Sequence, residues 1–198
     1  MNTKEQIIEE ALNLFSQKGY DAVSVRHIAK AVGIKESSLY YHFKNKQEIF
    51  DTIVDFCFQK AEEYFRRQAL PFEKGDDLSR FCTTDPEELT DLLFTTFRYF
   101  FEDPYNVRFR KLLILSQYGS QKIQTIYRHL YREYPIRLQS HIFQMLMDAG
   151  LFRKENPHAV AMEFYSVVYL LIHSSDNFQE AVPYLKEHIH QLLKNYQI

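Results

Sequence analysis

The chain has 198 residues, which is enough for one large hydrophobic core or two small ones. Its formal net charge of −2 excludes a protein that coats nucleic acid through bulk positive charge. Only five Gly and six Pro interrupt it, and this scarcity of helix breakers favours an all-α fold.

Targeting and redox signals are few. The first residues, Met1 to Glu5, lack the apolar segment of a signal peptide, and the longest near-apolar run, 164–172, is far shorter than the ~20 residues that span a bilayer. Cys57 and Cys82 fit neither a metal-site spacing nor a disulfide framework. We therefore expect a soluble cytoplasmic protein with reduced thiols, no cofactor, no metal and no membrane association.

The first predicted helix begins at Thr3, which forms a capping-box spacing with Gln6, and ends at Gly19. The next segment, 24–43, predicts two short helices joined by a tight turn. Ser24 is a suitable N-cap, and Gly33 stands where a Cβ would be costly. Leu39 and Phe43, four residues apart, fix the buried side of the second helix. A helix-turn-helix of this size is typical of proteins that place a helix in the DNA major groove.

This segment resembles the DNA-binding domain of the tetracycline-repressor (TetR) family of bacterial regulators. The resemblance lies in Ser24-x-Arg26-x-Ile28-Ala29-x-x-x-Gly33, then Leu39-Tyr40-x-x-Phe43, then Lys44-Asn45-Lys46 and Glu48, and it covers roughly residues 5–50. It implies a helix-turn-helix DNA-binding domain at 1–45 and a helical effector-binding and dimerisation domain at 46–198. In all it implies about nine helices, a homodimer and no enzymatic activity.

Candidate DNA contacts come from the same segment. Hydrogen-bonding side chains in the first turns of the second helix can reach base edges, and cations or hydroxyls at helix starts can hold phosphates. The resemblance adds positions that commonly touch DNA in the family. The full set is Ser24, Arg26, Lys35, Glu36, Ser37, Ser38, Tyr40, Tyr41, His42 and Lys46.

Three of these positions have open alternatives. Tyr40 could pack in the domain core and present only its hydroxyl, and Arg26 could be solvated surface. Lys35 replaces the capping Ser or Thr usual in the family. Glu36 could accept from cytosine N4, repel phosphate, or simply favour the helix N-terminus. Residues 1–50 hold seven Lys or Arg and six Asp or Glu, so binding depends on individually placed cations.

The rest of the chain predicts further helices at about 46–69, 86–103, 106–118, 120–149 with a kink at Pro135, 157–174, and from near Pro183 to the end. The polar, breaker-rich segment 71–86 predicts a loop. An unbroken helix after residue 45 would couple the DNA-binding domain to the body.

The 17 Phe and 14 Tyr need a structural explanation. For any single ring an ordinary core position is the simpler interpretation. Rings with a few polar groups also line small-molecule sites, and the family resemblance implies an effector held in the body. The candidate lining residues are Phe94, Phe97, Phe101, Phe109, Tyr127, Tyr131, Phe143 and Met147.

The last two predicted helices suggest dimerisation. Between Ala159 and Ile172 only Glu163 and Ser166 are plainly polar, so that helix needs cover on both flanks. The final helix repeats apolar residues at spacings of three and four, as in helices that pair with one another. The candidate interface residues are Phe164, Val168, Leu171, Val182, Leu185, Ile189, Leu192 and Tyr196.

Taken together, the sequence predicts a ligand-responsive transcriptional regulator. We expect a repressor that binds a palindromic double-stranded DNA operator as a homodimer and is released by a small, hydrophobic or aromatic effector. One alternative is a constitutive dimeric DNA-binding protein without an effector. A remote alternative is a di-iron enzyme, since Glu155-x-x-His158 and Glu187-x-x-His190 have the required spacing.

Overall fold

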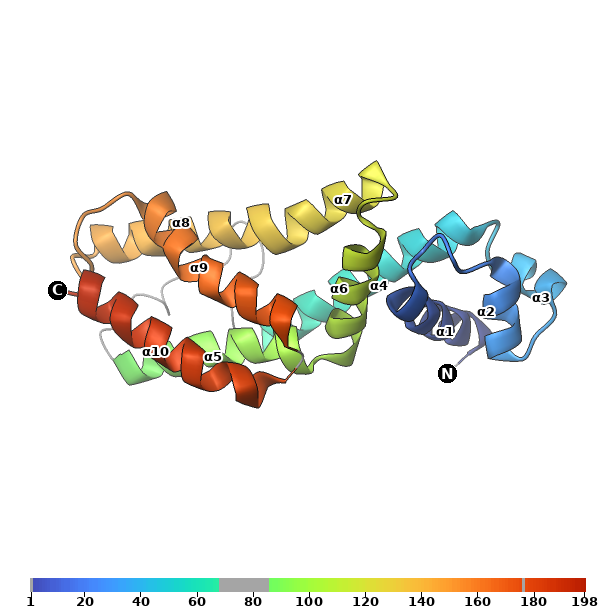
Figure 1. Ribbon diagram of the computed structural model, residues 1–198, viewed down its shortest axis with the longest axis horizontal. Coiled ribbons are helices and arrows are strands. Elements are labelled where there is room, and N and C mark those ends of the chain that lie inside the picture. The colour runs from blue at the N-terminus through green and yellow to red at the C-terminus, as the bar shows by residue number, and fades with distance from the viewer. Residues whose placement is uncertain (1, 68–85, 176) are drawn as a thin grey trace. The chain divides into compact units, whose positions relative to one another are not determined.

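The computed structural model describes residues 2–67, 86–175 and 177–198. Among them all the regular elements are helices, which confirms the predicted all-α fold (Figure 1). Residues 71–85 of the predicted loop lie outside the described residues, and its last residue, Pro86, begins α5. None of the described helices combines the length and apolar character needed to cross a membrane.

The chain divides into two compact units, residues 1–63 with 104–127 and residues 64–103 with 128–198. The first therefore contains more than the predicted 1–45 domain. It holds α1 (Thr3–Lys18), α2 (Val25–Val32), α3 (Glu36–His42), most of α4 (Lys46–Arg67), α6 (Pro104–Ser116) and most of α7 (Gln121–Arg128).

The core of the first unit is built on α1, which packs against α2 and α6. Its apolar positions at helical spacing are fully buried, as the sequence predicts. Across the α1–α6 contact, Arg108 forms a half-buried ion pair with Glu9 at 2.8 Å. The cap of α1 differs from the prediction: Asn2, not Thr3, accepts from the backbone N–H of Glu5 and completes the capping box. Asn2 and Glu5 have the same three-residue spacing, one position earlier.

The second unit holds α5 (Pro86–Glu102), the π-helical segment η2 (His129–Glu133), α8 (Tyr134–Asp148), α9 (Pro157–Ser174) and α10 (Phe178–Tyr196). Helix α9 packs against α8 and α10, and α10 packs against α5 (Figure 1). Helix α10 begins five residues before the predicted start at Pro183, because Asn177 caps it by accepting from Gln179 N–H at 3.0 Å. Pro183 is exposed within the second turn, where it lacks the N–H that would otherwise donate to the carbonyl of Gln179.

The predicted kink at Pro135 takes the form of the π-helical turn directly before it. Proline cannot donate a backbone hydrogen bond to the carbonyl four residues earlier, and its ring crowds that carbonyl. Widening the preceding turn to π-helix relieves this conflict. The run from 121 to 148 therefore stays helical throughout, with one widened turn and no break at Pro135.

Candidate functional site

The helix-turn-helix is formed by α2 and α3, and its local chemistry explains its shape. The Ser24 hydroxyl accepts from His27 N–H at 3.2 Å, while Ser24 N–H donates to His27 Nδ1 at 3.2 Å, a reciprocal cap at the start of α2. Gly33 ends α2 in the left-handed conformation (φ 77°, ψ 28°), and its N–H bonds back to α2 carbonyls. The Ile34 N–H then donates to Ala29 O at 2.9 Å. Both caps fix the turn that presents α3.

Helix α3 presents its polar side to solvent. Leu39 is buried beneath it, as predicted, and Phe43 is buried directly after its end. The side chains expected to face DNA at Lys35, Glu36, Ser37 and Ser38 are exposed. Lys35 occupies the N-cap position of α3, and its side chain makes no capping hydrogen bond.

The tyrosines of α3 are surface residues. Tyr41 is 86% exposed and Tyr40 is 52% exposed, so Tyr40 is not a core residue. His42 is partly buried and lies edge-on to the Tyr41 ring, with the ring centres 5.2 Å apart. The two residues thus present one joint surface at the end of the helix.

Arg26 on α2 lies close to Glu36 on α3, with Nε 3.8 Å from Oε1. Both side chains are well exposed, so the attraction is weak and is screened by salt. Glu36 is thereby paired with Arg26, which the sequence also predicts to contact DNA. The sequence alone could not have shown this pairing, because it depends on the angle between the two helices.

The Lys46 ammonium, which the sequence predicts to contact a DNA phosphate, already contacts Tyr20 of its own chain. It donates to Tyr20 O at 3.0 Å and stands 4.2 Å from the centre of the Tyr20 ring. Burial raises the pKa of Tyr20, and the charges of Asp21 and Asp51 raise it further. The Tyr20 hydroxyl therefore stays protonated at neutral pH.

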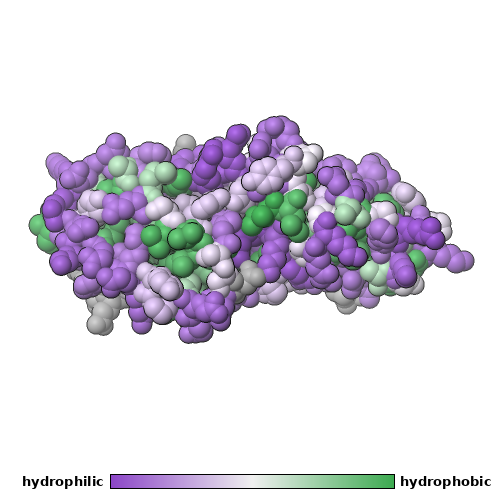
Figure 2. Space-filling model, viewed as in Figure 1, coloured by the Kyte–Doolittle hydropathy of each residue, from purple (hydrophilic) through white to green (hydrophobic). Residues whose placement is uncertain are grey.

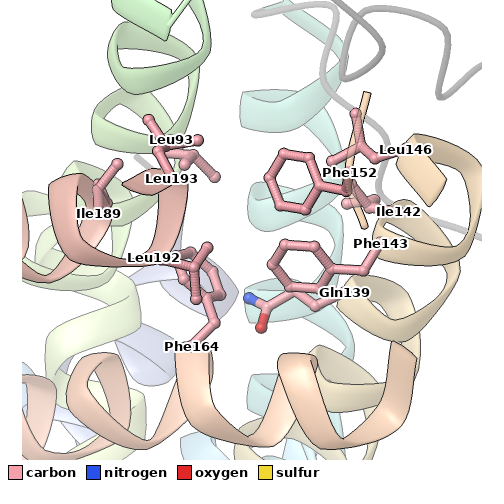
Figure 3. Close-up of a pocket in the computed structure, with 10 residues that line it drawn as sticks. All are labelled: Leu93, Gln139, Ile142, Phe143, Leu146, Phe152, Phe164, Ile189, Leu192 and Leu193. Carbon is pink, nitrogen blue, oxygen red and sulfur yellow. The ribbon is translucent and has the colours of Figure 1, made fainter. Parts of the chain in front are cut away.

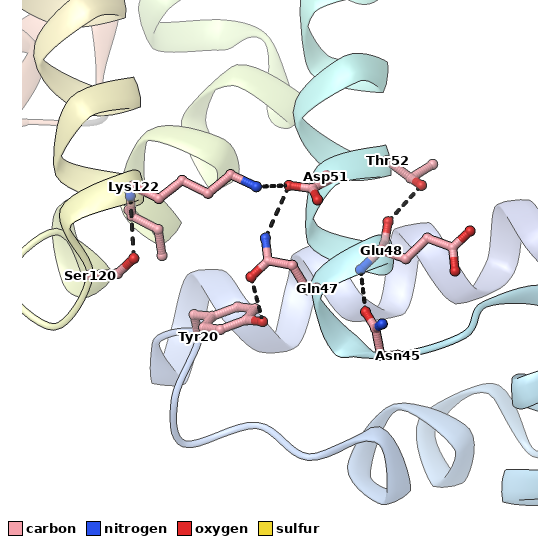
Figure 4. Close-up of polar contacts among 9 residues, drawn as sticks. Tyr20, Asn45, Gln47, Glu48, Asp51, Thr52, Ser120 and Lys122 are labelled. Carbon is pink, nitrogen blue, oxygen red and sulfur yellow. Dashed lines mark hydrogen bonds and ion pairs between the residues drawn. The ribbon is translucent and has the colours of Figure 1, made fainter.

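A polar chain braces the helix-turn-helix from behind (Figure 4). The Tyr20 hydroxyl donates to Gln47 Oε1 at 3.1 Å, and Gln47 Nε2 donates to Asp51 Oδ1 at 3.0 Å. The same Asp51 oxygen accepts from Lys122 Nζ at 2.5 Å. Tyr20 N–H also donates to the buried Ser116 Oγ at 2.8 Å. The loop before α2 is thus tied to α4, α6 and α7, contacts between distant positions that no local sequence signal indicates.

The start of α4 is capped by neighbouring side chains. Asn45 Oδ1 accepts from Glu48 N–H at 2.8 Å (Figure 4). The Glu48 carboxylate accepts from Lys44 N–H at 2.6 Å. The chain turn between α3 and α4 is therefore held by side chains from both sides.

The second unit contains a small apolar cavity (Figure 3). Its free space is about 30 Å³, room for about two water molecules. Three phenylalanine rings and the amide of Gln139 surround it in Figure 3. The lining residues are Leu93, Gln139, Ile142, Phe143, Leu146, Phe152, Phe164, Ile189, Leu192 and Leu193.

Most residues predicted to line an effector site are elsewhere. Of the eight, Phe143 lines this cavity. Phe97 and Phe101 are buried among other rings of the second unit, against Phe164 and Phe178. The remaining five do not line it either: Phe94 stacks edge-on to Phe178, Tyr131 and Met147 are core residues of the second unit, and Phe109 and Tyr127 belong to the first unit.

Most of the predicted dimer residues are covered by their own chain. Helices α9 and α10 pack on each other and on α8 and α5, so their apolar periodicity faces the core of the same chain. Leu171, Val182 and Tyr196 are half-buried. The other five are fully buried within their own chain: Phe164, Val168, Leu185, Ile189 and Leu192. The large apolar side chains that these two helices expose are Met162, Leu170 and Tyr184.

The motif of the remote enzyme alternative is not assembled into a site. Glu155 precedes the N-cap of α9, and in the described part of the chain no group of three or more His, Cys, Asp or Glu is placed to hold a metal ion.

These features define a helical protein whose first unit carries a helix-turn-helix domain. Residues 7–53 match the family described as "Bacterial regulatory proteins, tetR family". The helix-turn-helix segment is therefore similar to the regulatory proteins of that family.

Similar proteins agree with this assignment. The biofilm operon icaADBC HTH-type negative transcriptional regulator IcaR of Staphylococcus epidermidis is 45% identical over 64 residues, 32% of this chain and 35% of the relative. The matched region is thus about a third of the length of that relative.

Solved structures extend the likeness of fold to the whole chain. PfmR, a TetR-family transcriptional regulator from Thermus thermophilus, has a TM-score of 0.69 with 22% identity over 98% of this chain and 97% of its own. SmeT in complex with triclosan has a TM-score of 0.66 with 18% identity over 99% of this chain and 92% of its own.

Proposed function

We propose that the chain is a ligand-responsive transcriptional repressor that binds a palindromic DNA operator as a homodimer in the cytoplasm and is released by a small apolar effector. The observation that carries this proposal is α3 itself. Its polar side is exposed from Lys35 to Tyr41, and a buried Leu39 and the left-handed Gly33 fix its direction. A short, rigidly held helix with exposed hydrogen-bonding groups suits reading in the major groove.

Base contacts are assigned to the exposed side of α3. The Ser37 and Ser38 hydroxyls can donate or accept, and the Tyr41 ring and hydroxyl extend furthest from the core. Glu36 can accept from a cytosine amino group if Arg26 turns to a phosphate, since their ion pair is weak and exposed.

Phosphate contacts are assigned to residues on either side of α3, at the starts of α2 and α4. The Ser24 hydroxyl uses a lone pair to cap α2, so its own proton remains available to a phosphate oxygen. Lys46 keeps donors beyond the one bound to Tyr20 O, so it can add charge at the start of α4 without leaving that carbonyl. Repression is supported by the printed name of the IcaR relatives, which are negative regulators.

For dimerisation we propose the outward face of α9 and α10. These helices run past each other with Phe164 O accepting from His188 Nε2 at 2.9 Å. Their outer sides expose Met162, Leu170 and Tyr184, and hydrophobic surface is visible over α9 in Figure 2. Two copies joined by this face would form a four-helix bundle. Two linked reading helices then bind with a large gain in effective concentration.

For the effector we propose the cavity of the second unit. Its apolar wall and aromatic rings are typical of small-molecule sites, and the similar SmeT structure holds triclosan. The small free space also supports the second candidate, a constitutive repressor whose body only dimerises.

Selection of bound duplexes from a random DNA library, followed by footprinting of the enriched sequences, tests the proposal. We expect an inverted repeat with half-sites about one helical turn (~34–36 Å) apart. Enrichment of a single asymmetric site, or of no sequence, would contradict binding by a two-fold dimer. Operator affinity that no apolar compound changes would favour the constitutive alternative.

A further inference from the structure

The described part of the wall around the cavity of the second unit is electrically neutral. The described residues that line it are apolar except for Gln139, and none of them carries a charge. A charged ligand would lose its hydration there without gaining a counter-charge. The site therefore selects uncharged molecules.

Three rings set the shape of the guest. The ring centres of Phe143 and Phe152 lie 5.8 Å apart, and their planes are tilted by 37°. The ring centres of Phe143 and Phe164 lie 5.7 Å apart, and their planes are almost perpendicular. Rings arranged at such angles can offer both an edge and a face to a further ring. The wall thus favours a flat aromatic guest over a branched aliphatic one.

One polar atom breaks the apolar wall. The Gln139 amide projects from α8 into the space between Phe143 and Phe164 (Figure 3). Its Oε1 is buried and accepts no hydrogen bond. A buried acceptor without a donor is costly to the folded protein, so a ligand that supplies a donor at this point gains more than one that does not.

From these three observations we propose that the effector is a small uncharged aromatic molecule with one hydrogen-bond donor, of the phenol class, and that Gln139 Oε1 receives the donor. This inference rests on the proposed effector site. Since the free space holds only about two water molecules, a ring can enter only if lining side chains move. Binding is thereby linked to a rearrangement of the core of the second unit.

Calorimetric titration of the full chain with three matched probes tests the proposal: 4-ethylphenol, its methyl ether 4-ethylanisole, and the anion 4-ethylbenzoate. We expect the phenol to bind at least tenfold more tightly than the ether, and the benzoate not to bind. In Gln139→Leu the phenol and the ether should bind equally. Gln144→Leu, an exposed glutamine on the same helix, is the control and should keep the preference.

Several outcomes would overturn the proposal: equal binding of phenol and ether by the unaltered chain, a preference that survives in Gln139→Leu, tighter binding of the benzoate, or no binding of any probe. Thermal unfolding of Gln139→Leu checks that it folds. Operator affinity is measured separately with labelled DNA. Phenol binding that leaves operator affinity unchanged would contradict the proposed regulation but not the ligand class.

Discussion

The Tyr165 hydroxyl donates a hydrogen bond to the backbone carbonyl of Tyr131 at 2.9 Å, and both residues are buried in the second unit. In an α-helix the Tyr131 carbonyl would accept from the residue four positions later, which is Pro135 and has no N–H. Tyr165 therefore supplies, from α9, the donor that proline removes from α8. A local exception in one helix is compensated by a side chain of its neighbour.

Removing that donor should destabilise the second unit. We expect Tyr165→Phe to lower the free energy of unfolding by about 0.5–1.5 kcal/mol, because a buried hydrogen bond is lost. In a Pro135→Ala background the helix regains a backbone donor for Tyr131, so the same substitution should cost less. Urea unfolding of the four combinations measures both effects. An equal penalty in the two backgrounds would contradict this account, and Tyr118→Phe, on the surface of the first unit, is the control.

The ion pair between Lys122 and Asp51 ties α7 to α4 in the first unit. Both side chains are about half exposed, so we expect Lys122→Gln to lower unfolding free energy by no more than ~1 kcal/mol. The loss should shrink at high salt, since screening weakens an exposed pair. Urea unfolding at two salt concentrations tests this, with exposed Lys30→Gln as the control. A loss independent of salt would mean that packing, not charge, holds the contact.

Gly33 is the position where the turn demands a particular backbone. Its φ of 77° is strained for residues with a Cβ, although no other atom lies within 4 Å of where that Cβ would be. We therefore expect Gly33→Ala to cost about 1–2 kcal/mol of unfolding free energy through backbone strain alone. Gly33→Asn should cost less, because asparagine tolerates this conformation. Denaturant unfolding compares them, and an alanine variant as stable as the native chain would disprove the argument.

The helix-turn-helix could be predicted because its signals are local. The Ser24 cap, the Gly33 turn and the Leu39–Phe43 spacing each fix structure within a few residues. The α9–α10 surface could not be predicted in the same way. Periodicity shows that Leu185 and Ile189 are buried, but not against what, and here the covering elements belong to the same chain.

The cavity illustrates the same limit. A stripe of rings such as Phe97 and Phe101 looks alike in sequence whether it lines a cavity or packs against other rings, and here it packs. Gln139 carries the more useful signal, a polar residue between apolar helix positions. Its significance depends on the absence of a partner for Oε1, which only the three-dimensional structure reveals.

Tyr41 tests the recognition helix. It is 86% exposed, so replacing it should not alter the core. We expect Tyr41→Ala to weaken operator binding by about 1–3 kcal/mol while leaving the unfolding free energy within about 0.5 kcal/mol. Tyr118→Ala is a matched control, since Tyr118 is 87% exposed in the same unit but outside the helix-turn-helix. Fluorescence anisotropy with labelled operator measures affinity, and equal affinities for both variants would remove α3 from the interface.

Leu170 tests the proposed dimer face. It is 63% exposed on α9, so a charge there should leave the protomer folded but place an unpaired carboxylate inside the bundle of two chains. We expect Leu170→Glu to be monomeric by light scattering, with unchanged helical circular dichroism. Its operator affinity should fall steeply, because each reading helix would then bind alone.

Two comparison variants separate this effect from general damage. Leu115→Glu places the same charge on a leucine that is 55% exposed on α6 of the first unit and is not part of the proposed face, so it should remain dimeric. Leu185→Glu buries the charge at a position with no exposure, so it should unfold the second unit rather than yield a folded monomer. A dimer that persists in Leu170→Glu would exclude this face. A folded monomer from Leu185→Glu would instead mean that α10 contributes its inner side, so the pattern across the three variants identifies which side of the helices joins the chains.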